Sequence, residues 1–235
     1  RAAAKLKDKK YRTQTGLFLV EGIKLVQEVL DSEWEVEHIF ITADTSLKFD
    51  LNSLLRLKPL IKISEVSREI LGKLSDVQTA QGVVATVKQK HFSGDDIPLN
   101  SRSVLILENI QDPGNMGTLI RSAVATGIDA VICAGDCVDS YAPKVLRSTM
   151  GGVFRIPIIK YSIADTWHYL NTHNFKTFAA SLHDAADLYT TDLSAPAAIW
   201  LGNEAHGLSA DTLAACEQKI YIPQVGNIES LNVAV

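Results

Sequence analysis

Three stretches of the 235-residue sequence combine amides, carboxylates, hydroxyls and glycines, the groups that bind ligands and move protons. They are residues 108–115 (ENIQDPGN), 201–209 (LGNEAHGLS) and 226–232 (GNIESLN). The three stretches lie at the ends of short apolar runs that are typical of buried strands. Because ligands bind at the carboxyl ends of the strands in an open parallel sheet, we expect the three stretches to form one site.

Five side chains in or near these stretches could do chemistry, and each also has a structural interpretation. An amide or hydroxyl side chain here could cap a helix or contact a ligand. An arginine outside the apolar stripe of its helix could face solvent or bind an anion. A carboxylate that follows a strand could accept hydrogen bonds from turn amides or from a ligand. The residues alone leave both interpretations open. The five are Asn115, Arg121, Glu204, Ser230 and Asn232.

Several function classes are disfavoured by missing signatures. The sequence has no G-x-x-x-x-G-K-[ST] motif, no G-x-G-x-x-G after a strand and no G-x-S-x-G, which argues against P-loop ATPases, dinucleotide enzymes and α/β hydrolases. Cys133 and Cys137 lack a second ligand pair, so we expect no metal site. The absence of a signal peptide and of a long apolar run predicts a cytoplasmic protein that does not contact a membrane.

The elements that position these residues follow from apolar periodicity, in a composition (46% apolar, 21% charged) typical of globular proteins. In the first part we expect strands at 17–20, 36–42, 60–63 and 82–87, helices at 23–30 and 66–74, a further element at 47–55, and a helix cap at Ser64. The polar stretch 88–100 resembles a linker. We predict a small α/β domain over residues 1–96.

A second α/β domain with a parallel sheet is predicted for residues 97–235. Its expected strands span 104–107, 130–133, 154–159, 176–180, 198–201 and 219–222. Its expected helices span 116–126, 143–150, 164–170 and 210–216. The alternation of strands with helices is the pattern that produces a parallel sheet covered by helices.

The beginning of the chain is basic although the formal net charge is −4. Six lysines and arginines between positions 1 and 12 face a single acidic residue, Asp8. This density suits contacts with RNA phosphates, although a solvated helix face would look the same. The predicted RNA-binding residues are Lys5, Lys9, Lys10 and Arg12.

The three polar stretches, read together, carry a family resemblance. Residues 109–127 (NIQDPGNMGTLIRSAVATG), residues 201–209 followed by IYIP at 220–223, and residues 228–235 (IESLNVAV) resemble the three ordered motifs of the SpoU (TrmH) family of RNA ribose methyltransferases in the SPOUT superfamily. Residues 16–22 (GLFLVEG) are similar to the substrate-binding domain that many members carry.

The resemblance implies methylation of a ribose 2′-hydroxyl in RNA, with ribosomal RNA favoured over transfer RNA and S-adenosyl-L-methionine as the cofactor. It also implies a C-terminal trefoil knot, a ribosomal-protein-like N-terminal domain and a homodimer. Family members continue past the third motif into a final helix, so the domain is expected to be incomplete at Val235. Two alternatives stay open: a non-catalytic RNA-binding protein that retains the fold, and an enzyme that methylates a base nitrogen.

Carried over residue by residue, the resemblance assigns catalytic roles to Asn115, Arg121, Glu204, Ser230 and Asn232. It assigns cofactor contacts to Leu201, Gly202, Ile222 and Leu231. The family's arginine is often described as the base, but a guanidinium has a pKa above about 12 and rarely loses its proton. We therefore expect Arg121 to hold the phosphate beside the target ribose.

Overall fold

The computed structural model describes residues 2–46, 60–77, 79–194, 196–226 and 230–235. Contacts between Cα atoms divide the chain into two compact units. The first unit contains residues 1–90 and 141–154, and the second contains residues 91–140 and 155–235. The domain boundary expected between residues 96 and 97 stays a prediction. The expected element at 47–55 lies outside the described residues.

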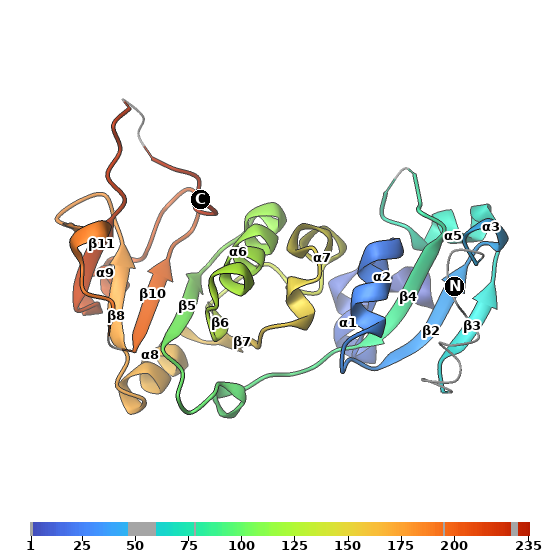
Figure 1. The fold of residues 1–235 in the computed structure, drawn as a ribbon, viewed down its shortest axis with the longest axis horizontal. Helices are drawn as coiled ribbons and strands as arrows, with labels where there is room; N and C mark the ends of the chain where they lie inside the picture. The colour runs from blue at the N-terminus through green and yellow to red at the C-terminus, as the bar shows by residue number, and fades with distance from the viewer. Residues whose placement is uncertain (1, 47–59, 78, 195, 227–229) are drawn as a thin grey trace. The chain divides into compact units, whose positions relative to one another are not determined.

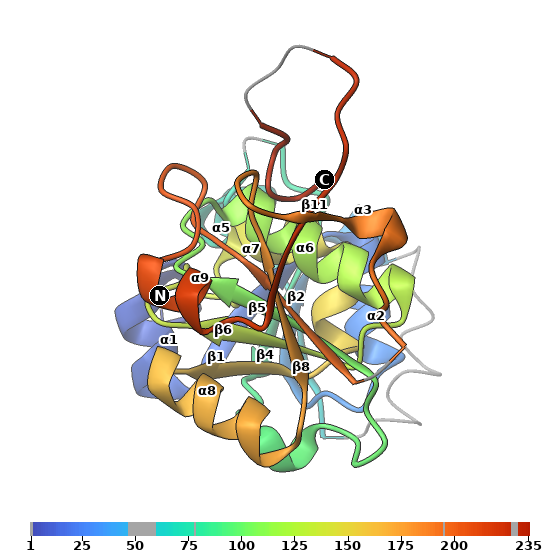
Figure 2. The same cartoon turned by 90° about the vertical axis from the view of Figure 1, so that its left-hand side faces the viewer.

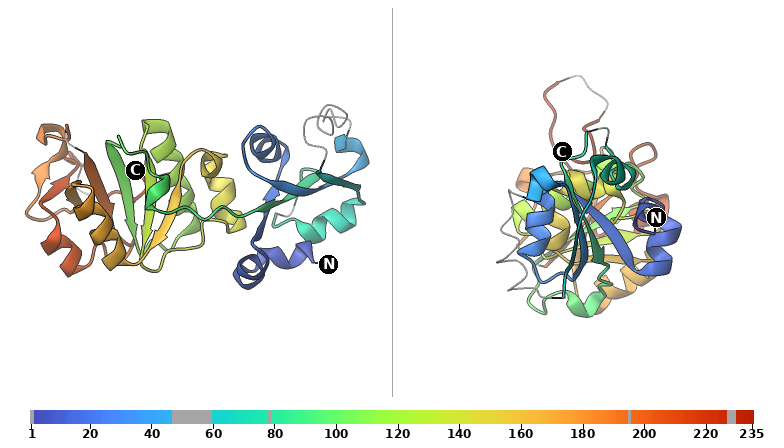
Figure 3. Two further views of the ribbon diagram at one scale, coloured as in Figure 1. Left: turned by 90° about the horizontal axis from the view of Figure 1, so that it is seen from below. Right: turned by 90° about the vertical axis from the view of Figure 1, so that its right-hand side faces the viewer.

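The first unit is built on a four-stranded mixed sheet with the order β1-β4-β2-β3. Strand β4 runs antiparallel to β1 and β2, whereas β2 and β3 are parallel. The strands are β1 (Leu17–Glu21), β2 (Val36–Ile41), β3 (Lys62–Glu65) and β4 (Val83–Lys88). Helices lie on both faces (Figure 3), and the described ones are η1 (Ala3–Lys7), α1 (Lys9–Thr15), α2 (Ile23–Leu30), α3 (Ala43–Ser46) and α5 (Arg68–Leu74).

A later segment of the chain completes this unit. It contains α7 (Pro143–Thr149) and η3 (Gly152–Phe154). The ring of Tyr141 lies 4.6 Å from that of Phe18, and Trp34 packs edge-on against Phe154 at 5.4 Å. Aromatic rings bury large apolar areas, so this cluster fixes residues 141–154 within the unit.

The second unit is a parallel sheet of seven described strands with the order β7-β6-β5-β10-β8-β11-β9 (Figure 1). Every strand pair in it is parallel. The strands are β5 (Ser103–Glu108), β6 (Ala130–Ala134), β7 (Ile158–Tyr161), β8 (Lys176–Ala180), β9 (Ala186–Asp187), β10 (Ala197–Leu201) and β11 (Gln218–Tyr221).

Helices cover the two faces of this sheet. Figure 2 shows α6 (Pro113–Thr126) on one face and α8 (Ile163–Thr172) with α9 (Ala210–Ala215) on the other. Short η2 (Gly94–Asp96) and η4 (Leu188–Thr190) lie in the connections. Ile106, Ile132 and Trp200 are fully buried under α8, where Trp200 stacks on Trp167 at 4.8 Å. This core holds β5 and β10 rigidly side by side.

The α/β class of both parts and the parallel sheet of the second part are confirmed. Two local predictions are wrong. The helix cap is Ser67, which accepts the Ile70 amide, because the hydroxyl of Ser64 bonds His38 instead. The expected strand 154–159 begins only at Ile158, after the η3 turn, and β9 was not foreseen. The trefoil knot stays a prediction. Among the described residues, every helix is too short or too polar to span a bilayer.

Candidate functional site

The order of strands changes direction in the middle of the seven-stranded sheet. From β5 the chain adds β6 and then β7 on one side, and β10 pairs with the other side of β5, with Leu201 opposite Leu107. The loops after β5 and β10 therefore leave the same edge at a topological switch point. Crevices at such points are the usual ligand sites of open α/β sheets.

The carboxylate of Glu204 joins these two loops. Its Oε2 accepts the backbone N–H of Gln111 at 3.2 Å, and its Oε1 accepts that of Asp112 at 3.0 Å. The side-chain amide of Asn115 donates to the same Oε1 at 3.2 Å. Partial burial acts to raise the pKa of Glu204, but these hydrogen bonds outweigh it and lower the pKa. The group is therefore a carboxylate at neutral pH.

Asn203 makes a second connection between the loops. Its side-chain amide donates to the carbonyl of Asn109 at 2.8 Å, while its Oδ1 accepts the N–H groups of Ala205 at 2.9 Å and His206 at 3.1 Å. Its backbone pairs in both directions with Gly207, at 3.0 and 2.8 Å. One residue thus closes its own turn and binds the neighbouring loop.

Two backbone features allow this close approach. A Cβ built on Gly202 would lie 2.2 Å from the carbonyl carbon of Gly207, so only glycine fits at this position. Asn109 has a φ of 54°, in the left-handed region that asparagine tolerates better than most residues. Its Oδ1 accepts the Asp136 amide at 2.8 Å, which fixes this conformation.

The N-cap of helix α6 is not Asn115, which was one of the two interpretations of that residue. Asp112 is its N-cap and accepts the Asn115 amide at 2.9 Å, and Pro113 occupies the first turn. The interpretation of Asn115 as the cap is therefore wrong. Because Asp112 performs that role, the Asn115 side chain is available to bind Glu204.

Arg121 lies farther along the same helix and is exposed. The apolar stripe of this helix contains Met116, Ile120 and Ala123, which are buried. Within the described part of the chain, Arg121 makes neither a hydrogen bond nor an ion pair. An exposed guanidinium without a protein partner is suited to an anionic ligand.

Glu108 is a site residue that the sequence analysis did not select. Its side chain is 1% exposed at the end of β5, and its Oε1 accepts the Ser209 amide of the β10 loop at 3.1 Å. Its Oε2 is buried and has no hydrogen-bond partner among the described residues. Asn109 and Asn203 were also quoted in the motifs without a role. The available signal was a carboxylate at the end of an otherwise apolar strand.

The remaining predicted residues lie apart from these contacts. Ser230 and Asn232 are exposed, and Asn232 forms a local turn through the Ala234 and Val235 amides, with no hydrogen bond to Asn115, Arg121 or Glu204. Neither residue caps a helix among those that the structure describes. The predicted cofactor contacts are Leu201 (half-buried), Gly202 (buried), and Ile222 and Leu231 (each 36% exposed).

Metal-binding clusters of three or more His, Cys, Asp or Glu residues are not found among the residues that the structure describes. The described site consists of backbone amides, a carboxylate, amides and one free guanidinium. Such groups orient a substrate and bind anions.

Comparison with protein families gives two matches along the chain. Residues 102–235 match the SpoU rRNA Methylase family. Residues 1–85 match the MRM3-like substrate binding domain. The first match contains both loops of the switch point, and the second contains β1, β2, β3 and the beginning of β4.

Individual relatives match over nearly the whole chain. The 23S rRNA (guanosine(2553)-2′-O)-methyltransferase RlmP of Bacillus subtilis is 33% identical, over 98% of this chain and 89% of the relative. The 23S rRNA (uridine(2479)-2′-O)-methyltransferase of Streptomyces viridochromogenes is 29% identical, over 98% and 83%. The crystal structure of an AdoMet-bound rRNA methyltransferase from Sinorhizobium meliloti superposes with a TM-score of 0.88 at 28% identity, covering 99% of this chain and 88% of that one.

The lowered pKa of Glu204 gives a testable pH dependence. Because the pKa is lower in the folded protein, the bridge is intact above the ordinary value of 4.5 and is lost as the pH falls through the folded value. Amide proton shifts of Gln111 and Asp112, followed by NMR, should titrate together with a midpoint below 4.5. In Glu204→Gln this titration should disappear, and a midpoint at or above 4.5 in the wild type would contradict the bridge.

Proposed function

The chain belongs to the SpoU rRNA methylase family, and from this premise we propose that it transfers a methyl group to a ribose 2′-hydroxyl in ribosomal RNA. The observation that carries the proposal is the contact between the Asn115 amide and the Glu204 carboxylate, which joins the first two motifs at the switch point of the sheet. Relatives that match over nearly the full chain are 23S rRNA 2′-O-methyltransferases, which supports ribosomal RNA as the substrate.

S-adenosyl-L-methionine fits this edge of the sheet. Ile222 and Leu231 expose apolar side chains suited to an adenine ring, and the buried, unpaired Oε2 of Glu108 offers an acceptor at the end of β5 in the described structure. We assign the cofactor contacts to Leu201, Gly202, Ile222 and Leu231. When bound, the cofactor supplies an electrophilic methyl group on a sulfonium.

The protein's own contribution is to orient the ribose and to stabilise charge. Arg121, which has no partner among the described residues, would hold the phosphate beside the target ribose through paired N–H donors. This contact fixes the 2′-hydroxyl and stabilises the oxyanion that develops as its proton leaves, with the phosphate as a relay for that proton. Glu204 and Asn115 would keep the loop before α6 in place. Ser230 and Asn232 complete the proposed catalytic set.

The first unit would hold the RNA. Lys5, Lys9 and Lys10 are exposed and suited to phosphate contacts. Arg12 differs from them, because its side chain is 3% exposed and its guanidinium donates to the carbonyls of Leu6 at 2.9 Å and Lys7 at 2.6 Å. We therefore give Arg12 a supporting role behind the lysines. A homodimer and a cytoplasmic location complete the proposal.

The function is tested by incubating the protein with radiolabelled S-adenosyl-L-methionine and separated ribosomal and transfer RNA. We expect label in ribosomal RNA, at one position after mapping. A protein that binds RNA but neither binds the cofactor nor transfers label would be the non-catalytic alternative. Label confined to transfer RNA would contradict the choice of substrate.

Arg121→Ala should lower turnover by about a hundredfold or more, because a positioned charge on the reacting group contributes effects of that size. Arg68→Ala is the matched control. Arg68 lies in the first unit, not in the unit of the switch point, and forms an exposed ion pair with Asp44 of the same unit. Single-turnover rates with saturating cofactor measure the effect. The assignment of Arg121 is wrong if the alanine variant keeps more than about a tenth of the wild-type rate.

Gly202→Ala should weaken cofactor binding by at least about tenfold, because the new Cβ would displace the Gly207 backbone and open the turn that holds Asn203. Gly72→Ala is the matched control, since nothing lies within 4 Å of the Cβ it would add in α5. Titration calorimetry with S-adenosyl-L-methionine reports both affinities. Equal affinities for the two variants would remove Gly202 from the proposed cofactor site.

A further inference from the structure

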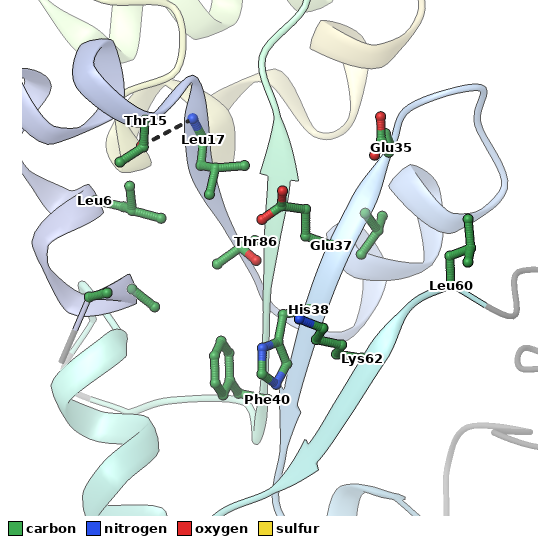
Figure 4. Close-up of a pocket in the computed structure, with 13 residues that line it drawn as sticks. Leu6, Thr15, Leu17, Glu35, Glu37, His38, Phe40, Leu60, Lys62 and Thr86 are labelled. Carbon is green, nitrogen blue, oxygen red and sulfur yellow. Dashed lines mark hydrogen bonds between the residues drawn. The ribbon is translucent and has the colours of Figure 1, made fainter.

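A hollow lies in the first unit, on the face of the four-stranded sheet that η1 partly covers. Figure 4 shows its lining, with Leu6 and Leu17 on one side, Thr86 of β4 at the base and Leu60 on the other side. Its volume is about 530 Å³. This falls in the range of roughly 300–1,000 Å³ that is typical of sites for small organic groups.

One wall of this hollow is a pair of stacked rings. The imidazole of His38 lies 4.1 Å from the ring of Phe40 with an interplanar angle of 20°, and Nε2 of His38 is 2.8 Å from the Ser64 hydroxyl. Burial, together with the charge of Lys62, lowers the pKa of His38, so the imidazole is neutral at pH 7. Both rings are partly exposed. An uncharged pair of stacked rings, fixed in place by the contact with Ser64, is a surface on which a planar base can stack.

Two polar groups in the hollow lack partners. The β2 register shifts between Val36 and His38, and Figure 4 shows the intervening Glu37 side chain lying over the sheet beside Thr86. The Glu37 carboxylate accepts no hydrogen bond from any described residue. Thr86 lines the hollow, and its hydroxyl has no hydrogen-bond partner in the described ranges. Because this hydroxyl is open to the hollow, it can donate a hydrogen bond to a ligand there or accept one from it.

The charges of the lining decide what kind of group fits. Glu35 forms an ion pair with Lys88 at 2.6 Å. Glu37 forms no ion pair with a described residue, although the charge of Lys88 acts on it from farther away. Lys62 is the single lysine or arginine in the described lining. Unpaired carboxylates repel phosphates but accept hydrogen bonds from base N–H groups. Guanine offers two neighbouring N–H donors on its Watson–Crick edge, which match the two oxygens of one carboxylate.

We propose that this hollow binds an unpaired guanine base of the substrate RNA, stacked on the His38–Phe40 pair and hydrogen-bonded to Glu37 and Thr86. The proposal rests on the proposed function in one respect, since RNA is the substrate that would supply the base. It assigns base recognition to a site that the motifs of the catalytic unit do not contain. The lysines of η1 and α1 would contact the backbone without selecting sequence.

The test uses the whole chain and three labelled octanucleotides: octauridylate, the same oligomer with one central guanosine, and one with inosine at that position. Fluorescence anisotropy should show about tenfold tighter binding of the guanosine oligomer than of octauridylate, the size expected for one paired hydrogen-bond contact with a base edge. Inosine, which lacks the exocyclic amine, should lose part of the preference. Glu37→Gln should bring the ratio close to one, because it removes one charged acceptor for the guanine N–H groups. His38→Ala should weaken the binding of all three oligomers, because a stacking surface accepts any base.

Glu69→Gln is the matched control, because this exposed carboxylate lies in α5 and bonds Lys73. It should keep the full preference for guanosine. Equal binding of the three oligomers by the wild type, or a Glu37→Gln variant that retains the preference, would overturn the proposal. Cofactor titration of the same samples separates the two claims: failure to bind S-adenosyl-L-methionine would contradict the proposed function, whereas the guanosine preference does not depend on it.

Discussion

The carboxylate of Glu204 holds together the two loops on which the site depends. It accepts hydrogen bonds from two backbone amides before α6 and from the Asn115 side chain, so the loop after β10 fixes where that helix begins. Arg121 is placed by the same helix. Hydrogen bonds to a charged acceptor are stronger than those between neutral groups. The three donors lower the pKa of Glu204 and so keep its carboxylate ionised.

This contact requires a particular sheet and a particular turn. Strands β5 and β10 are distant in sequence but adjacent in space, and the fully buried Ile106 and Trp200 fix them there. The loop after β10 can reach across only because Gly202 lets the backbone at Gly207 approach it. The buried carboxylate of Glu108, at the end of β5, also accepts a hydrogen bond from the backbone amide of Ser209. The chemistry therefore lies on loops that two rigid strands hold in place.

Much of this arrangement is predictable from the sequence. Apolar periodicity locates α2 at its exact bounds and most strands to within two residues, because the buried face of each element repeats regularly. Short polar contacts are less predictable. Periodicity cannot distinguish Ser64 from Ser67 as a cap, nor show that Arg12 is buried against carbonyls in a basic stretch that otherwise faces solvent.

In the site, too, some features are predictable from the sequence and others are not. The motifs identify Asn115 and Glu204, and their contact follows from the parallel order of β5 and β10. The Oε2 of Glu108, which has no partner among the described residues, and the bulge that places Glu37 over the sheet depend on three-dimensional packing, so no sequence pattern reveals them. Functions that rest on such groups become visible only in the structure.

The central claim is that the protein transfers the methyl group to the ribose 2′-oxygen of RNA. The most direct measurement is alkaline hydrolysis of RNA methylated by this protein, followed by mass spectrometry of the labelled fragment. Hydrolysis needs a free 2′-hydroxyl, so the account predicts that the label is recovered in an alkali-resistant dinucleotide with the extra methyl mass on the sugar. Label recovered in mononucleotides with the methyl mass on the base would contradict it.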